Sequence, residues 1–159
     1  MPTAKLPTGI DLYYEVLGQG EPLLLVPSTA FAGNVWEASQ VPELSKRLQL
    51  IIFDPRGTGR SSKPESFYTI EHMAGDAVAL LDEIGLPSSH VLGHSMGGRI
   101  ALQMALDWPG KVRSLIMAAS GSGGAAREGH SIYPGLNFSF VDSLVRNGLE
   151  KHVRHEIVD

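Results

Sequence analysis

The chain has 159 residues, enough for one domain with a sizeable core, and its 43% hydrophobic and 19% charged residues are typical of a soluble globular protein. Its net charge of −4 argues against nucleic acid or an anionic membrane surface as a partner, because those surfaces bind basic patches. The absence of cysteine excludes disulfides and thiolate metal sites. Since residues 1–5 lack the apolar run of a signal peptide and no segment is long enough to span a bilayer, we expect a cytoplasmic protein.

The first part of the chain alternates short apolar runs with polar and glycine-rich stretches. Continuous apolar runs are typical of strands that are buried on both faces of a parallel sheet. The patterns predict a hairpin of strands 3–6 and 10–16, a buried strand over 23–26, a helical stretch from 35 to about 48, and a buried strand over 50–53. A glycine-rich turn from Asp54 to Ser62 follows.

The alternation continues in the second part. Thr69 is a plausible N-cap for a helix whose apolar residues recur at helical spacing up to Ile84, and Gly85 and Pro87 end that helix. Further patterns predict a strand that ends near 92, a helix over 99–106 and a strand over 114–118. Buried strands that alternate with helices predict an α/β fold, a mostly parallel sheet with helices on both faces.

A Gly-x-Ser-x-Gly motif, Gly93 to Gly97, stands between an expected strand and an expected helix. At such a turn the serine adopts a strained backbone conformation at the top of the sheet, where neighbouring side chains would collide unless they are glycines. The hydroxyl of Ser95 is then exposed ahead of a helix N-terminus, whose free N–H groups can bind a developing oxyanion. The alternative is a chance loop without chemistry, but the strand before it and the helix after it favour acyl transfer.

Three features together resemble the α/β-hydrolase fold family, in particular its small bacterial esterases, enol-lactonases and carbon–carbon bond hydrolases. They are the run Gly93 to Gly98, the segment Asp54 to Ser61 after a buried strand, and Trp36 at the start of the first expected helical stretch. The resemblance implies that residues 1–118 are the N-terminal part of the hydrolase core and that residues 119–159 begin an incomplete helical lid. It also implies a fold that here lacks its C-terminal strands.

In this family the nucleophile would be Ser95, and the backbone N–H groups of Met96 and Thr29 would form the oxyanion hole. Family members usually carry His-Gly after the corresponding strand, where this chain has Pro27 and Ser28. Because the oxyanion donor is a backbone group, this departure does not by itself remove the hole, although it affects the path of the loop and the acyl groups accepted.

The resemblance places the catalytic acid and histidine after the nucleophile, near the final strands, which are not in this chain. Without a base, Ser95 would be a weak nucleophile. Acidic and histidine side chains of the expected lid are an alternative source, but a solvated helical surface explains them more simply; they are His130, Asp142, Glu150, His152, His155, Glu156 and Asp159. His94 adjoins Ser95, and its side chain is expected to point away from the hydroxyl and to pack beside the elbow.

Other residues have both a functional and a structural interpretation. Asp54 and Arg56 either shape the rim of a pocket or fix a tight turn, and we favour the turn. The aromatic residues Trp36, Phe31 and Tyr68 either line an acyl pocket or belong to the core, and the sequence does not separate these alternatives.

The resemblance implies a serine hydrolase of small esters, lactones or related carbonyl compounds, with neither a metal nor an organic cofactor. We expect a second polypeptide to supply the C-terminal strands with the acid and the histidine, because a sheet that ended at residue 118 would expose an unpaired edge. The alternatives are a non-catalytic hydrolase-like binding module and an inactive truncated fragment.

Overall fold

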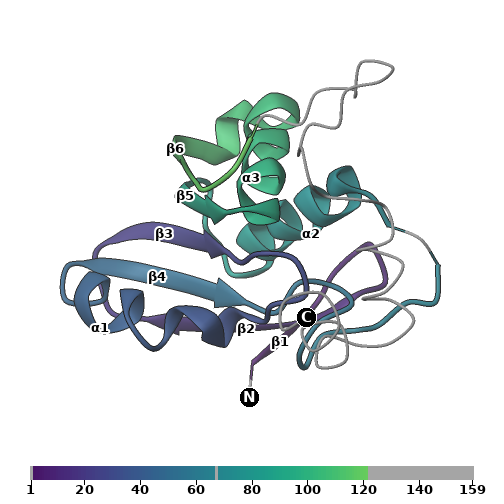
Figure 1. Cartoon of the computed structure of the whole chain (residues 1–159), viewed down its shortest axis with the longest axis horizontal. Helices are drawn as coiled ribbons and strands as arrows, with labels where there is room; N and C mark the ends of the chain where they lie inside the picture. The colour runs from purple at the N-terminus through teal and green to yellow at the C-terminus, as the bar shows by residue number, and fades with distance from the viewer. Residues whose placement is uncertain (1, 67, 122–159) are drawn as a thin grey trace, which may run out of the picture. The chain divides into compact units, whose positions relative to one another are not determined.

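Six strands form one sheet in the order β1-β2-β4-β3-β5-β6 in the computed structural model, which describes residues 2–66 and 68–121 (Figure 1). The strands are β1 (Thr3–Lys5), β2 (Asp11–Leu17), β3 (Glu21–Val26), β4 (Leu48–Phe53), β5 (Ser89–His94) and β6 (Val112–Ala118). The helices are α1 (Gln40–Leu44), α2 (Ile70–Glu83) and α3 (Met96–Asp107), with short 3-10 helices η1 (Gly33–Trp36) and η2 (Pro109–Lys111).

The strand pairing confirms the predicted sheet. β1 and β2 form the expected antiparallel hairpin, and β2 pairs antiparallel with β4. The three remaining pairs, β3 with β4, β3 with β5, and β5 with β6, are all parallel. The parallel strands therefore end on the same side of the sheet, and the segments that follow β3, β4 and β5 meet there.

Helices cover both faces of the sheet, as the alternation of strands and helices predicts. On one face, Leu24, Ile51 and Val91 of the central strands pack with buried residues of α2 and α3. On the other face, Leu25 and Ile52 pack with Trp36 and the small helix α1. Figure 1 shows α1 beside β4, and α3 with α2 on the side of β5 and β6. The apolar β3 is buried from its second residue to its last, as expected of a central strand.

The predicted helical stretch from 35 to about 48 is wrong in extent. The chain forms η1, then α1, and β4 already begins at Leu48, where it pairs with Glu21. Pro42 explains the late start of α1, because proline has no N–H to donate and is accommodated only in the first turn of a helix. The stretch therefore divides into two short helical pieces.

The other expected elements are present, with bounds that differ from the predicted ones by a few residues at most. Thr69 caps α2 as predicted: its hydroxyl accepts from the His72 N–H at 3.4 Å, and the His72 ring accepts from the Thr69 N–H at 3.3 Å. Within residues 2–66 and 68–121, no helix is both long and apolar enough to cross a membrane. The lid interpretation concerns residues 119–159, of which 122–159 lie outside the described residues, so it stays a prediction.

Candidate active site

Ser95 occupies the turn between β5 and α3 with a backbone conformation that non-glycine residues rarely adopt, φ 54° and ψ −117°. Its N–H donates to the Ala118 carbonyl at 2.9 Å, and its own carbonyl accepts from the Gly98 N–H at 3.0 Å. The next strand and the first turn of α3 therefore hold the serine in this conformation. Strain of this kind persists only where the surroundings enforce it, and it clusters at functional sites.

Close backbone packing explains the glycines on either side. A Cβ added to Gly93 would lie 2.1 Å from the Gly97 carbonyl oxygen, and one added to Gly97 would lie 2.1 Å from the Val26 carbonyl oxygen. The start of α3 thus lies against β5 on one side and against the end of β3 on the other. No side chain fits at either position without moving backbone.

The loop after β3 brings Thr29 to the same end of the sheet. The Phe31 N–H donates to the Ser28 carbonyl at 3.2 Å, which closes a turn over Thr29 and Ala30, and Ala30 has a positive φ of 64°. Thr29 and Met96 both border a cavity of about 450 Å³. The first N–H groups of a helix have no acceptor within that helix, so the Met96 amide is available to a ligand.

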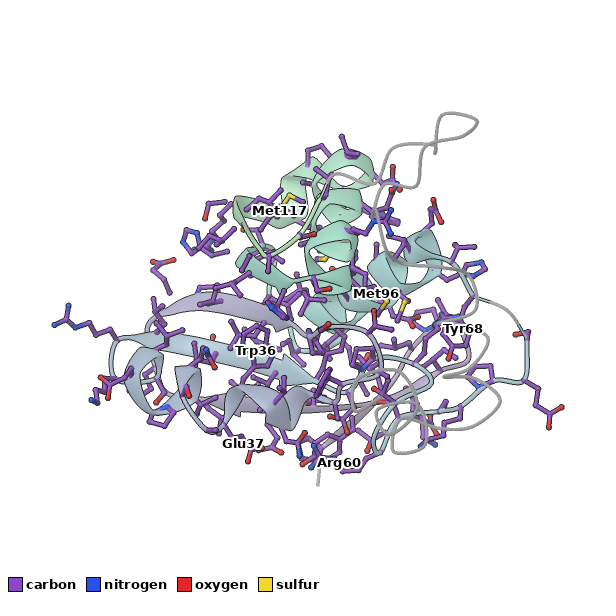
Figure 2. The ribbon with its side chains drawn as sticks, viewed as in Figure 1. Trp36, Glu37, Arg60, Tyr68, Met96 and Met117 are labelled. Carbon is purple, nitrogen blue, oxygen red and sulfur yellow. The ribbon has the colours of Figure 1, made fainter. Side chains whose placement is uncertain are left out.

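The cavity is mostly apolar with one charged wall. Thr29, Ala30, Arg56, Gly57, Thr58, Tyr68, Thr69, Ile70, Met73 and Met96 line it. Figure 2 shows Met96 and Tyr68 beyond the ends of β3 and β4, on the side toward which these strands point. The cavity reaches the elbow through Met96, whereas Ser95 itself is not among the lining residues.

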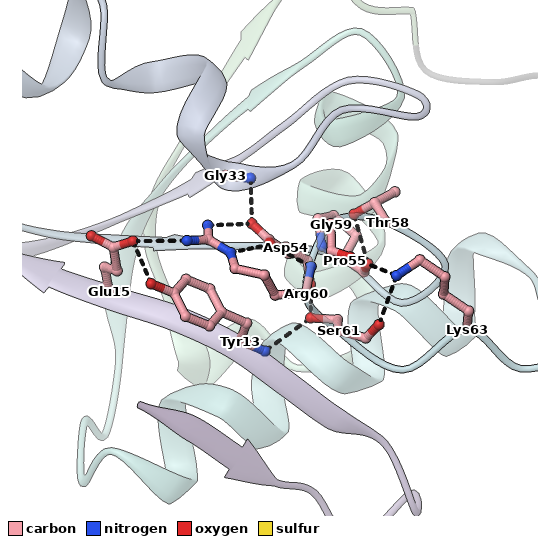
Figure 3. A network of polar contacts seen from close by, with 10 residues as sticks. All are labelled: Tyr13, Glu15, Gly33, Asp54, Pro55, Thr58, Gly59, Arg60, Ser61 and Lys63. Atoms are coloured by element: carbon pink, nitrogen blue, oxygen red, sulfur yellow. Dashed lines mark hydrogen bonds and ion pairs between the residues drawn. The ribbon is translucent and has the colours of Figure 1, made fainter. Parts of the chain in front are cut away.

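Asp54 fixes the turn after β4, as the structural interpretation predicts (Figure 3). Its fully buried carboxylate accepts from the Gly33 N–H at 2.8 Å and from the N–H and Nε of Arg60, both at 2.9 Å. The Arg60 guanidinium also stacks on the ring of Tyr13, 3.4 Å from its centroid. The carboxylate thereby joins η1 to the glycine-rich turn, and Arg60 links that turn to β2.

Opposing effects set the charge state of Asp54. Burial by itself would raise the pKa of this carboxyl, but the hydrogen bonds from the Arg60 side chain, the Arg60 N–H and the Gly33 N–H outweigh it and lower the pKa below its usual value. Asp54 is therefore ionised near neutral pH, and its role is to hold the turn rather than to exchange a proton.

Arg56 differs from its prediction, because it reaches α2 rather than bracing its own turn. Its Nε and Nη2 donate to the two carboxylate oxygens of Asp76 at 2.5 and 2.6 Å, and the Thr8 hydroxyl also donates to Asp76 at 3.0 Å. The Arg56 side chain is 10% exposed and that of Asp76 is 2% exposed. Arg56 also borders the cavity, so the structural and functional interpretations both apply to it.

Asp76 is the polar residue that reasoning from sequence missed. It lies on the buried face of α2, between Met73 and Leu80 at helical spacing. The sequence does contain a signal for this residue, an acidic side chain inside the apolar stripe of a helix. Such a position indicates a buried carboxylate with a charged or hydrogen-bonding partner, because carboxylates are rarely buried without one.

The structure assigns the three aromatic residues to different environments. Trp36, the last residue of η1, is buried in the core, Phe31 is half exposed, and Tyr68 lines the cavity. The expectation that His94 packs beside the elbow is wrong: its side chain is exposed, because it follows the last inward position of β5. The histidine and acidic residues of 130–159 lie outside the described residues, and within the described ones no cluster of His, Asp or Glu has the make-up of a metal site.

The family model described as the alpha/beta hydrolase fold matches residues 21–153. A protein of Azorhizobium caulinodans that is named as a carbamate hydrolase, RutD, is 41% identical over 105 residues, which are 66% of this chain and 39% of that protein. A relative of the same name from Caulobacter vibrioides is 37% identical over 110 residues, 41% of its length. The chain thus spans about two fifths of these relatives.

Solved structures give the same result. A hydrolase from Pseudomonas aeruginosa is 30% identical with a TM-score of 0.74, over 79% of this chain and 48% of that one. The enol-lactonase from Burkholderia xenovorans is 24% identical, a level that bears on the fold alone, with a TM-score of 0.80 over 96% of this chain and 57% of that one. The chain belongs to the α/β-hydrolase fold family.

Proposed function

We propose that this chain carries the nucleophile of a serine hydrolase that acts on small esters, lactones or related carbonyl compounds. The observation that carries the proposal is the backbone of Ser95, φ 54° and ψ −117°, held directly before α3 by contacts that leave no room for side chains at Gly93 and Gly97. A strained serine at a strand-to-helix turn, beside unpaired helix N–H groups, is the arrangement that acyl transfer requires.

In the proposed reaction, the Ser95 hydroxyl oxygen attacks the substrate carbonyl carbon while a histidine removes the hydroxyl proton. The N–H groups of Met96 and Thr29 donate to the oxygen that becomes negatively charged. The leaving group departs with the proton from the histidine, and water then hydrolyses the acyl-enzyme by the same route.

The base and the acid of this reaction belong, in our proposal, to a second polypeptide with the C-terminal strands of the fold. Two observations support it: β6 is the last strand of the described sheet and leaves Ile116 49% exposed, and the matched relatives are much longer than the aligned stretch. The name shared by the relatives from Azorhizobium caulinodans and Caulobacter vibrioides, carbamate hydrolase, supports a carbonyl compound as the substrate class.

Hydrolysis of a short-chain nitrophenyl ester by the purified material tests the proposal. Ser95→Ala should lower kcat by at least about a thousandfold without changing the fold, because it removes the nucleophile. Ser39→Ala is the control, since Ser39 precedes α1 and its side chain makes no capping hydrogen bond. Full activity of Ser95→Ala would assign the nucleophile to another residue.

A further inference from the structure

One nitrogen of the Arg56 guanidinium, Nη1, has no hydrogen-bond partner among the described residues. Nε and Nη2 are bonded to Asp76, and Nη1 makes no hydrogen bond to any residue among 2–66 and 68–121. Among the described side chains, the buried nitrogen and oxygen atoms without a hydrogen bond are Trp36 Nε1 and Ser89 Oγ. Arg56 Nη1 is not one of them, so it is accessible to solvent. Arg56 therefore carries an N–H donor that no described residue occupies, and its side chain borders open space.

Arg56 borders two cavities at once. One is the 450 Å³ cavity that Met96 and Thr29 line, and the other, of about 510 Å³, lies on the side of Lys63 and Ser62. Any ligand that fills the first cavity, next to the elbow, would therefore lie beside Arg56.

The donor is fixed before a ligand arrives. Two bonds to a carboxylate that is itself 2% exposed set the plane of the guanidinium, and the Tyr68 ring lies 5.8 Å from its central carbon. A donor held in this way loses little conformational freedom when it binds an acceptor, which favours both affinity and selectivity.

The charges in the cavity identify the kind of acceptor. Among the described residues that line the first cavity, Arg56 is the one with a charge, and Asp76 already neutralises it. A ligand carboxylate would stand close to the Asp76 carboxylate without a second cation, whereas a neutral carbonyl oxygen accepts from Nη1 without that repulsion. The remaining walls, Met73, Met96 and Ile70, suit a short apolar chain.

We infer that Arg56 determines specificity by donating from Nη1 to a neutral carbonyl oxygen in the acyl part of the substrate, so that the site selects short acyl compounds with a second carbonyl. This inference rests on the proposed function, in which the ester carbonyl of the substrate reacts with Ser95. The residue positions the substrate and takes no part in bond making.

Binding of two matched esters to the Ser95→Ala chain tests the inference without turnover. Ethyl 4-oxopentanoate and ethyl pentanoate differ by one ketone oxygen, and the keto ester should bind at least about fivefold more tightly, as expected of one hydrogen bond from a charged donor. In Arg56→Met/Asp76→Leu, which removes both charges together, the ratio should fall to about one. Lys63 is a cation that borders only the second of the two cavities, so Lys63→Met is the matched control. It should keep the ratio of the two ester affinities.

Two results would overturn the inference: equal affinities for both esters in the chain with Arg56, or a preference for the keto ester that survives in the double variant. Should the double variant fail to fold, the nitrogen resonances of an arginine-labelled chain decide the matter, because the Arg56 signal should shift with the keto ester and not with the plain ester. Labelling of Ser95 by a fluorophosphonate is read separately. Labelled Ser95 without ester discrimination overturns only the role of Arg56, and discrimination without labelling overturns only the proposed reaction.

Discussion

At the scale of single residues, the elbow depends on backbone contacts that admit no side chain. Gly97→Val should lower the free energy of unfolding by about 2–4 kcal/mol, because its Cβ would lie 2.1 Å from the Val26 carbonyl oxygen. Urea denaturation measures the loss. Gly110→Ala is the matched control, since a Cβ there meets no atom within 4 Å, and a comparable loss in the control would contradict the explanation.

Asp54 links the stability of the chain to pH. Its folded-state pKa is depressed, so the stabilisation it contributes is complete above the unfolded value of about 3.9 and is lost as the pH falls through the folded pKa. Asp54→Asn should cost about 2–3 kcal/mol at neutral pH, because the amide does not replace the charge-assisted bonds to Arg60. The cost should shrink below pH 4.

Urea denaturation at pH 7 and at pH 3 measures both quantities. Asp107→Asn, which alters an exposed carboxylate at the end of α3, controls for the loss of one acidic group. A cost for Asp54→Asn that is the same at both pH values would rule out the linkage.

At the scale of elements, the pair of Arg56 and Asp76 ties the turn after β4 to α2. Arg56→Met alone should destabilise the fold by about 3–5 kcal/mol, because it leaves a carboxylate that is 2% exposed without its partner. Arg56→Met/Asp76→Leu should lower the free energy of unfolding by less than Arg56→Met does, because the double variant leaves no uncompensated buried charge. Thermal or urea unfolding of the three proteins tests this, and strictly additive losses would contradict it.

How far the sequence predicts the elements depends on how local their causes are. The buried strands, the Thr69 cap and the elbow follow from apolar runs, a capping residue and a glycine spacing, all of which lie within a few positions. The bond from Arg56 to Asp76 spans 20 residues, and the bonds of Asp54 join three segments. Such contacts become visible only when the sheet brings the carboxyl ends of its parallel strands together.

The prediction of one helical stretch after residue 35 is wrong for a reason that lies in the local sequence. Pro42 limits where a helix can begin, yet the apolar spacing on either side of it resembles a longer helix. The two aromatic residues Trp36 and Phe31 differ in exposure: Trp36, the last residue of η1, packs in the core, whereas Phe31 lies in the loop before η1 and is half exposed. Side-chain direction in a short turn is not encoded in a periodic pattern.

At the scale of the whole molecule, the described sheet ends at β6 with Ile116 half exposed. If a second polypeptide completes the sheet, intact mass under denaturing conditions on the folded material should give two species, one of them this chain at 17.1 kDa. Size-exclusion chromatography without denaturant should show them together. A single folded species of this mass that elutes as a monomer would contradict the second polypeptide.

The measurement that tests the central claim most directly is fluorophosphonate labelling of the folded material, followed by mass spectrometry of its peptides. We expect one adduct, on Ser95, that is lost in Ser95→Ala, retained in Ser39→Ala and absent after unfolding in urea. Unfolding separates this hydroxyl from the proposed histidine and from the proposed oxyanion donors, which together activate it. A folded sample that takes up no label on Ser95, or that is labelled equally after unfolding, would contradict the assignment of Ser95 as the nucleophile.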